Sequence, residues 1–382
     1  MLARLTTPET VGRFAVALAI TAPVIALAEM RLRDVLATDA AGDYSLAAYV
    51  RLTSVNGAAA LVVVTVISVA FGYAGEVLAV ILIVGVSKLV ELISNISYGA
   101  QQRAERMDRV GISLWLRGVI GATGLTVGIL LTDNLVWGVV GMTAAWTLIL
   151  VAYDWPQGRR AYPPTDVGAG KSPGKLGTLA WMALPLGVMQ MLITLSPSIP
   201  RLFLERTVGA ASLGVFAGMA FLVVGLSTVA RALAQAAAPR LGQRYMEGNM
   251  DGFLRVLTRQ VQIATLMGAL GILGAALVGR TVLTALYGPD YGVESGAFVA
   301  LMVYATTLFI SMQLTQGLIA ARRLREQMGL SIVVVAITFA LGLVWIGDHG
   351  IGGAVAVLIV SGAARLLGSG VLLHLAVREG LT

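Results

Sequence analysis

Long apolar runs alternate with short polar connections along the whole chain, and this pattern is typical of helices that cross a membrane. A membrane-spanning helix needs about 20 apolar residues to cross a hydrocarbon core about 30 Å thick. Eleven such runs are predicted, near residues 12–31, 50–72, 76–98, 111–131, 134–153, 177–199, 212–236, 257–279, 295–319, 328–347 and 351–376. The pattern therefore predicts an all-α polytopic membrane protein with about eleven transmembrane helices.

The composition agrees with this pattern and narrows the chemistry. Hydrophobic residues make up 57% of the chain and charged residues only 12%, whereas a soluble domain has about 25% charged residues. The chain has no cysteine, so it offers neither a disulfide framework nor a thiolate. Its two histidines, His349 and His374, are too few and too far apart in sequence to indicate a metal site.

Lysine and arginine residues are distributed unevenly between the two sides of the predicted helices. Seventeen of them lie in one set of connections and the C-terminal tail, five lie in the opposite connections, and five lie within predicted spans. The positive-inside rule places the first set in the cytoplasm, and it accounts for the net charge of +7 without a nucleic-acid partner. We expect a multi-pass protein of the bacterial inner membrane with a cytoplasmic C-terminus and Met1 outside.

A segment rich in proline, glycine and basic residues, 154–176, interrupts the series of apolar runs. Such a composition predicts a cytoplasmic linker without regular structure. The chain then divides into an N-lobe of five helices, 1–153, and a C-lobe of six helices, 177–382.

The two predicted lobes carry traces of an internal repeat. Residues 2–15, LARLTTPETVGRFA, align without a gap with residues 204–217, LERTVGAASLGVFA, at an offset of 202. Five aligned pairs are identical: Leu2/Leu204, Arg4/Arg206, Gly12/Gly214, Phe14/Phe216 and Ala15/Ala217. The alignment leaves the span 177–199 without a partner in the first half, so the opening residues read as the loop that follows a missing first helix of a twelve-helix fold.

Four stretches of the chain, taken in their order and spacing, resemble the Wzx-type polysaccharide flippases. They are YGAQQRAERMDRVGISLWLRG (98–118), LPLGVMQMLITLSPSIPRLFLERTVGAASLGVFAGMAFL (184–222), ARALAQAAAPRLGQRYMEGNMDGFLRVL (230–257) and YGPDY (287–291). These flippases belong to the multidrug/oligosaccharidyl-lipid/polysaccharide exporter superfamily. The resemblance implies two six-helix lobes around a central cavity.

The same resemblance implies a flippase that moves undecaprenyl-diphosphate-linked oligosaccharides from the cytoplasmic to the outer leaflet during polysaccharide biosynthesis. The expected partners are this lipid-linked substrate, membrane lipids and polysaccharide polymerase or export machinery. A P-loop is absent from the sequence, so we expect alternating access coupled to a membrane potential or an H⁺ or Na⁺ gradient, with no other cofactor. Alternatives are a lipid II flippase, a drug/cation antiporter and an inactive truncated protein. A polysaccharide polymerase or ligase, which would be an enzyme, is disfavoured because the outer connections are short.

Charged residues deep within predicted spans are the first candidates for a substrate site. Lys88 lies near the bilayer middle, Glu91 follows on the same helix face, and Arg365 lies similarly deep. A charge at this depth costs at least about 2.5 kcal/mol on insertion scales, so it normally faces protein or water. Lys88 and Glu91 either form a tolerated ion pair or belong to the cavity, where Lys88 can meet phosphate and Glu91 can take part in ion coupling.

Further candidates lie nearer the ends of the spans. Arg51, Arg117 and Arg231 can either snorkel to the interface or capture the head group at the cavity mouth. Arg201, at the outer end of the span 177–199, can anchor the helix at the interface or meet the diphosphate on release. Gln235 can bond sugar hydroxyls or a neighbouring helix.

Three prolines mark the same span as a candidate hinge or gate. Pro185, Pro197 and Pro200 each remove a helix hydrogen bond, so we expect this helix to be bent or interrupted.

Overall fold

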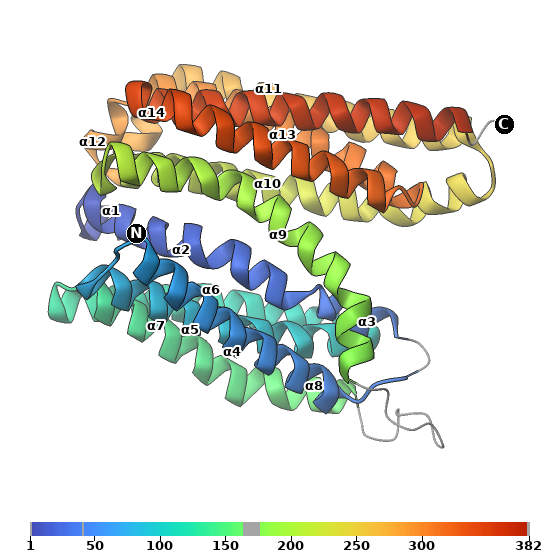
Figure 1. Cartoon of the computed structure of the whole chain (residues 1–382), viewed down its shortest axis with the longest axis horizontal. Helices are drawn as coiled ribbons and strands as arrows, with labels where there is room; N and C mark the ends of the chain where they lie inside the picture. The colour runs from blue at the N-terminus through green and yellow to red at the C-terminus, as the bar shows by residue number, and fades with distance from the viewer. Residues whose placement is uncertain (1, 40–41, 163–175, 380–382) are drawn as a thin grey trace. The chain divides into compact units, whose positions relative to one another are not determined.

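The computed structural model describes residues 2–39, 42–162 and 176–379. Every regular element in them is helical (Figure 1). The elements are α1 (Leu2–Leu5), α2 (Pro8–Glu29), α3 (Leu32–Thr38), α4 (Leu46–Ala70), α5 (Gly75–Arg103), α6 (Met107–Thr132), α7 (Leu135–Ile149), the π-helical turn η1 (Leu150–Asp154), α8 (Trp155–Ala161), α9 (Leu176–Thr207), α10 (Ala210–Met246), α11 (Met250–Tyr287), α12 (Pro289–Gly292), α13 (Ser295–Ala320) and α14 (Leu324–Glu379).

The described residues contain ten helical segments that are long and apolar enough to cross a membrane. One of these segments, α14, has 56 residues and a break at Gly350, where φ is 53° and ψ is −128°. The break falls between the predicted spans 328–347 and 351–376, because a backbone of this kind is accessible to glycine and disfavoured for other residues. With α14 counted as two segments, the described helices match the eleven predicted spans in number, and the all-helical fold class is confirmed.

The chain forms two compact units that do not coincide with the predicted lobes. The N-terminal unit contains Val16–Ser198, and the C-terminal unit contains Ile199–Thr382 together with Ala3–Ala15. Most of α9 thus packs with the N-terminal helices, although the sequence assigned 177–198 to the C-lobe. Gly187 explains part of this packing, since a Cβ there would lie 2.7 Å from the carbonyl oxygen of Leu27.

The predicted linker is partly helical. Trp155–Ala161 form α8, and the guanidinium of Arg103 lies 4.5 Å from the ring centroid of Tyr162 just beyond it. The expectation that residues 154–162 lack regular structure is therefore wrong for α8, because contacts with α5 stabilise a helix that its glycine and proline disfavour. Residues 163–175 of the predicted linker lie outside the described residues.

The aligned glycines of the internal repeat meet at one crossing within the C-terminal unit. A Cβ on Gly12 of α2 would overlap the carbonyl of Ala210, and a Cβ on Gly214 of α10 would overlap the carbonyl of Pro8. The offset of 202 converts the first contact into the second, because Pro8 aligns with Ala210 and Gly12 with Gly214. The contact is thus reciprocal, as expected for a two-fold relation.

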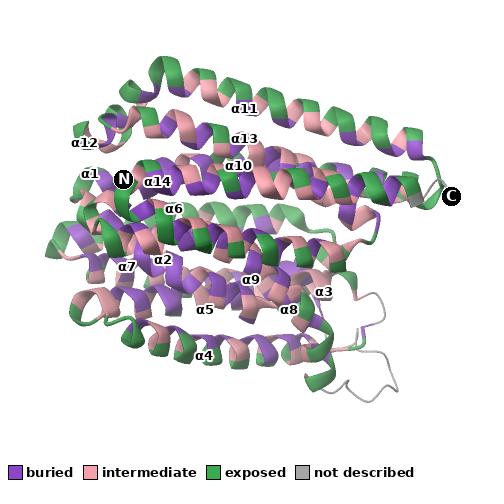
Figure 2. Ribbon diagram, turned by 45° about the horizontal axis from the view of Figure 1, so that its top comes forward, coloured by how far each residue is buried: buried purple, intermediate pink, exposed green. Residues whose placement is uncertain are grey.

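These two helices are also the most buried of the membrane-spanning segments. In the most apolar stretches of Pro8–Thr38 and Ala210–Met246, 67% and 61% of the residues are buried, against 17% in α11. Figure 2 shows buried residues repeating along α10 and exposed residues recurring along α11 and α4. The exposed side chains of α4 and α11 include many valines and leucines, as on helices that face lipid.

Candidate functional site

Lys88 and Glu91 form an ion pair on α5 in the N-terminal unit. The distance from Lys88 Nζ to Glu91 Oε2 is 2.7 Å, and the two side chains are 25% and 35% exposed. The three-residue spacing places both on one helix face, as the sequence predicts. Both side chains are partly accessible, so an external anion can approach Lys88 in place of Glu91.

Arg117 of α6 joins this pair through the indole of Trp146 on α7. The Arg117 guanidinium lies 4.6 Å from the ring centroid of Trp146, and Lys88 Nζ lies 5.9 Å from the same centroid. The indole N–H donates to the backbone oxygen of Arg117 at 3.2 Å. Two cations from two helices therefore share one aromatic ring, and Arg117 is 6% exposed rather than snorkelling to the interface.

A chain of hydrogen bonds runs from Arg117 to a buried carboxylate. Arg117 Nη1 lies 3.5 Å from the hydroxyl of Tyr98, which lies 2.7 Å from the hydroxyl of Ser113. Ser113 donates to Asp154 at 2.5 Å. Asp154 is fully buried on the π-helical turn η1, and such turns occur frequently at functional sites.

Sequence reasoning missed Asp154 and Tyr98, and it also missed Glu29. Glu29 accepts a hydrogen bond from Asn95 Nδ2 at 3.1 Å and interacts electrostatically with Glu91. It lies inside the predicted span 12–31, so the signal that singled out Lys88 was present for Glu29 as well. After Glu29 the helix breaks at Met30 and Arg31, whose φ angles are 47° and 49°.

The C-terminal unit contains a second cluster, which brings together Arg201, Tyr304 and Arg365. Both arginines interact electrostatically with Tyr304, which lies on α13. Neither arginine forms an ion pair with a carboxylate in the part of the chain that the structure describes. Arg201 Nε is buried without a hydrogen-bond partner among the described residues.

Three of the predicted candidates lie apart from both clusters. Arg51 is exposed in the second turn of α4, and Arg231 and Gln235 are exposed on α10. Neither cluster includes these three residues, so a role for them in binding substrate stays a prediction.

The comparisons with known proteins identify the architecture. The chain is 25% identical over 374 residues to the capsular polysaccharide biosynthesis protein CapF of Staphylococcus aureus, covering 96% of this chain and 91% of that protein. An inward-facing multidrug resistance MATE family transporter of the MOP superfamily superposes with a TM-score of 0.74 at 16% identity, over 97% of this chain and 92% of that one. The chain has the fold of a MOP superfamily transporter.

Other solved structures agree with the MOP fold. The lipid II flippase MurJ in an inward closed conformation superposes with a TM-score of 0.67 at 11% identity, over 98% of this chain and 89% of that one. A MOP superfamily transporter from Pyrococcus furiosus gives 0.71 at 16% identity, over 100% and 90% of the two chains. No protein-family model matches the chain. The three solved structures are those of two transporters and a lipid II flippase.

The proline-containing helix of this MOP fold is continuous. All of Leu176–Thr207 is helical as α9, so Pro185, Pro197 and Pro200 do not interrupt it. The boundary between the compact units, however, falls between Ser198 and Ile199, directly between Pro197 and Pro200. The two prolines thus lie where α9 passes from one unit to the other.

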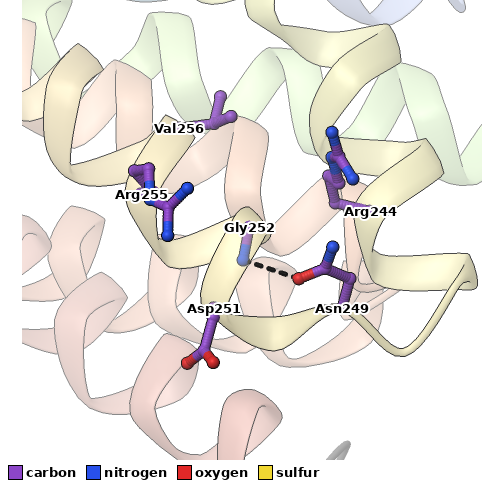
Figure 3. A pocket seen from close by; sticks show the side chains of 6 residues that line it. All are labelled: Arg244, Asn249, Asp251, Gly252, Arg255 and Val256. Atoms are coloured by element: carbon purple, nitrogen blue, oxygen red, sulfur yellow. Dashed lines mark hydrogen bonds between the residues drawn. The ribbon is translucent and has the colours of Figure 1, made fainter.

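A depression of about 380 Å³ lies at the turn between α10 and α11 (Figure 3). Its lining residues are Arg244, Asn249, Asp251, Gly252, Arg255 and Val256. The Asn249 side chain accepts from the Gly252 N–H at 2.8 Å and caps α11. This depression lies at the ends of the helices and is lined by side chains of both signs of charge. None of its lining residues belongs to the deep clusters. Among the described residues no group of three histidine or acidic side chains could hold a metal ion.

Proposed function

We propose that the chain is a flippase that translocates undecaprenyl-diphosphate-linked oligosaccharide repeat units from the cytoplasmic to the outer leaflet. The observation that carries this proposal is the pair Arg201 and Arg365 around Tyr304, which has no carboxylate partner among the described residues. The similarity to a capsular polysaccharide biosynthesis protein supports the same class of substrate.

Electrostatics connects the arginine pair with an anionic head group. Arg201 and Arg365 each interact with Tyr304 and have no carboxylate partner among the described residues, and an unpaired charge deep in a membrane-spanning helix costs at least about 2.5 kcal/mol on insertion scales. A diphosphate would offset this cost, because each guanidinium can donate two parallel hydrogen bonds to phosphate oxygens. The cluster is therefore poised for an anion.

The main alternative within the MOP fold is a drug/cation antiporter. Such a transporter needs acidic groups that remain available to a cation. In the C-terminal unit Arg201 and Arg365 have no carboxylate partner among the described residues. In the N-terminal unit Glu91 is paired with Lys88 and Asp154 accepts a hydrogen bond from Ser113, which leaves Glu29, hydrogen-bonded to Asn95, as the acidic group available to a cation. The charges favour an anionic substrate, which a lipid II flippase would also carry.

The expected setting is the bacterial inner membrane, with polysaccharide polymerase or export machinery receiving the flipped substrate. Translocation would proceed by alternating access driven by an ion gradient or the membrane potential. Pro197 and Pro200 lie at the boundary between the compact units, which supports their assignment as a hinge for that motion.

Deletion of the gene tests the proposed function directly. Lipid-linked repeat units should accumulate in the cytoplasmic leaflet of the deletion strain, and surface polysaccharide should be lost. Normal surface polysaccharide in a strain that also lacks every other flippase of this fold would overturn the proposal.

The arginine pair is tested in the same strain by Arg365→Ala. Because the substitution removes half of the anion-binding pair, complementation should fall at least about tenfold, the effect of losing one charge-assisted contact. Surface polysaccharide is measured together with the amount of protein in the membrane. Arg280→Ala, which changes an exposed arginine of α11 in the same unit, serves as the control and should complement fully. Full complementation by Arg365→Ala would show that Arg365 does not bind substrate.

A further inference from the structure

Two cations, Lys88 and Arg117, lie within about 6 Å of the ring centroid of Trp146. Its position is fixed by α6 along one edge of the indole. The indole N–H donates to the Arg117 backbone oxygen, and a Cβ on Gly121, one turn further along α6, would overlap indole Nε1 and lie 3.0 Å from Cδ1. Gly121 therefore lets the indole lie directly against α6.

Arg117 has hydrogen-bonding capacity that the protein leaves unused. Its side chain is 6% exposed, and its Nη2 has no hydrogen-bond partner among the described residues. Nη1 makes only a long contact, 3.5 Å, with Tyr98. A buried charged donor without a partner is costly, and a phosphate oxygen is the acceptor that a guanidinium binds best.

Lys88 has an internal anion, which an external one can replace. Its ammonium group is bound to Glu91 at 2.7 Å, yet the side chain is 25% exposed. Because Lys88 Nζ and the Arg117 guanidinium lie 5.9 and 4.6 Å from the same ring centroid, the two cations are at most about 10.5 Å apart, a span that an extended diphosphate with a hydrogen bond at each end can bridge. A ligand with two linked phosphates would give each cation its own set of oxygens, whereas a single phosphate would not.

We infer that Trp146 positions Lys88 and Arg117 as a paired receptor for a diphosphate in the N-terminal unit. Trp146 is a positioning residue, since the indole itself offers no anion-binding group beyond an N–H that is already donated. The inference rests on the proposed function for its biological role, and it adds a determinant of specificity for diphosphate over monophosphate.

The test measures binding of farnesyl diphosphate and farnesyl monophosphate to the full chain in nanodiscs by titration calorimetry. The wild type should prefer the diphosphate by about tenfold, as expected when a second charge-assisted contact is added. In an Arg365→Ala background, which removes half of the other proposed anion site, Trp146→Leu should reduce this preference to near unity with little change in monophosphate affinity. Trp146→Phe should retain most of the preference, because it keeps an aromatic face for both cations.

Two further variants separate positioning from packing. Gly121→Ala keeps the indole but displaces it from the cations, so it should also lose the preference, and it provides the test if Trp146→Leu does not fold. Trp137→Leu changes an exposed tryptophan of the same helix, 57% exposed, and should leave the preference unchanged.

The outcomes distinguish this inference from the proposed function. If Trp146→Leu and Gly121→Ala keep the wild-type preference, or if the wild type shows none, the paired receptor is wrong, whatever the deletion strain shows. If the preference depends on Trp146 while the deletion strain retains surface polysaccharide, the receptor stands and the proposed flippase function falls.

Discussion

The deep charged residues of the two units have different partners. Arg201 and Arg365 lack carboxylate partners among the described residues, whereas Lys88 is neutralised by Glu91. Burial of an unpaired cation is tolerated only when water or a ligand can reach it. The two units thus differ in how their cations are balanced, because the C-terminal arginines have no carboxylate partner among the described residues and Lys88 of the N-terminal unit has one.

This difference predicts the effect of removing the internal carboxylate. Glu91→Gln should raise the affinity for farnesyl diphosphate about tenfold, because Lys88 would no longer have to leave an ion pair to bind phosphate. Calorimetry on the purified variant checks the prediction. Glu326→Gln is the matched control, because Glu326 of α14 is paired with Arg323, the residue that precedes the helix. An unchanged or lower affinity in Glu91→Gln would mean that Glu91 orients Lys88 rather than competing for it.

Among the helices, α2 and α10 form the best-defined pair. Gly12 and Gly214 allow the two backbones to approach so closely that neither position has room for a Cβ. Such close approaches between small residues are the usual means of tight helix association in membranes. The reciprocity of the contact explains why a short alignment, 2–15 with 204–217, stands out in an otherwise diverged repeat.

Substitution of either glycine should destabilise the protein to a similar extent. Gly12→Ala and Gly214→Ala each force a methyl group into a backbone carbonyl, which should cost about 1–3 kcal/mol of folding free energy. Thermal unfolding of the detergent-solubilised variants measures the effect. Gly225→Ala, at a position on α10 with no atom near the new methyl group, should be neutral or slightly stabilising. Equal melting temperatures for all three variants would contradict the tight crossing.

At the scale of the whole molecule, orientation in the membrane follows from the distribution of arginine and lysine. The turn between α9 and α10 is predicted outside and the turn between α10 and α11 inside. The chain has no cysteine, so a single introduced thiol reports its own side without background.

We expect a membrane-impermeant maleimide to label Val208→Cys in intact spheroplasts and Glu247→Cys only after permeabilisation. Both parent side chains are well exposed, at 43% and 44%, so accessibility to the reagent does not limit labelling. Labelling is read by a mass shift of the purified protein. The reverse pattern would invert the predicted topology and place the C-terminus outside.

The sequence by itself determined the properties that depend on local hydropathy. The series of spans, the break near Gly350 and the depth of Lys88, Glu91 and Arg365 can all be read from one segment at a time, because each reflects the transfer of a helix into hydrocarbon. The repeat could also be read from sequence, since its glycines stand at fixed positions in both halves.

Only the tertiary structure decided which polar groups meet. The sequence pattern does not single out Trp146, Asp154 or Tyr304 as site residues. Their partners lie on other helices. Hydropathy fixes how deep a residue lies but leaves the rotation of each helix about its axis open, and that rotation decides whether Arg117 faces Trp146 or lipid. The same limit applies to the compact units, because most of α9 belongs to the N-terminal unit, and the close approach of Gly187 to Leu27 that contributes to this packing is not visible in the composition of the linker.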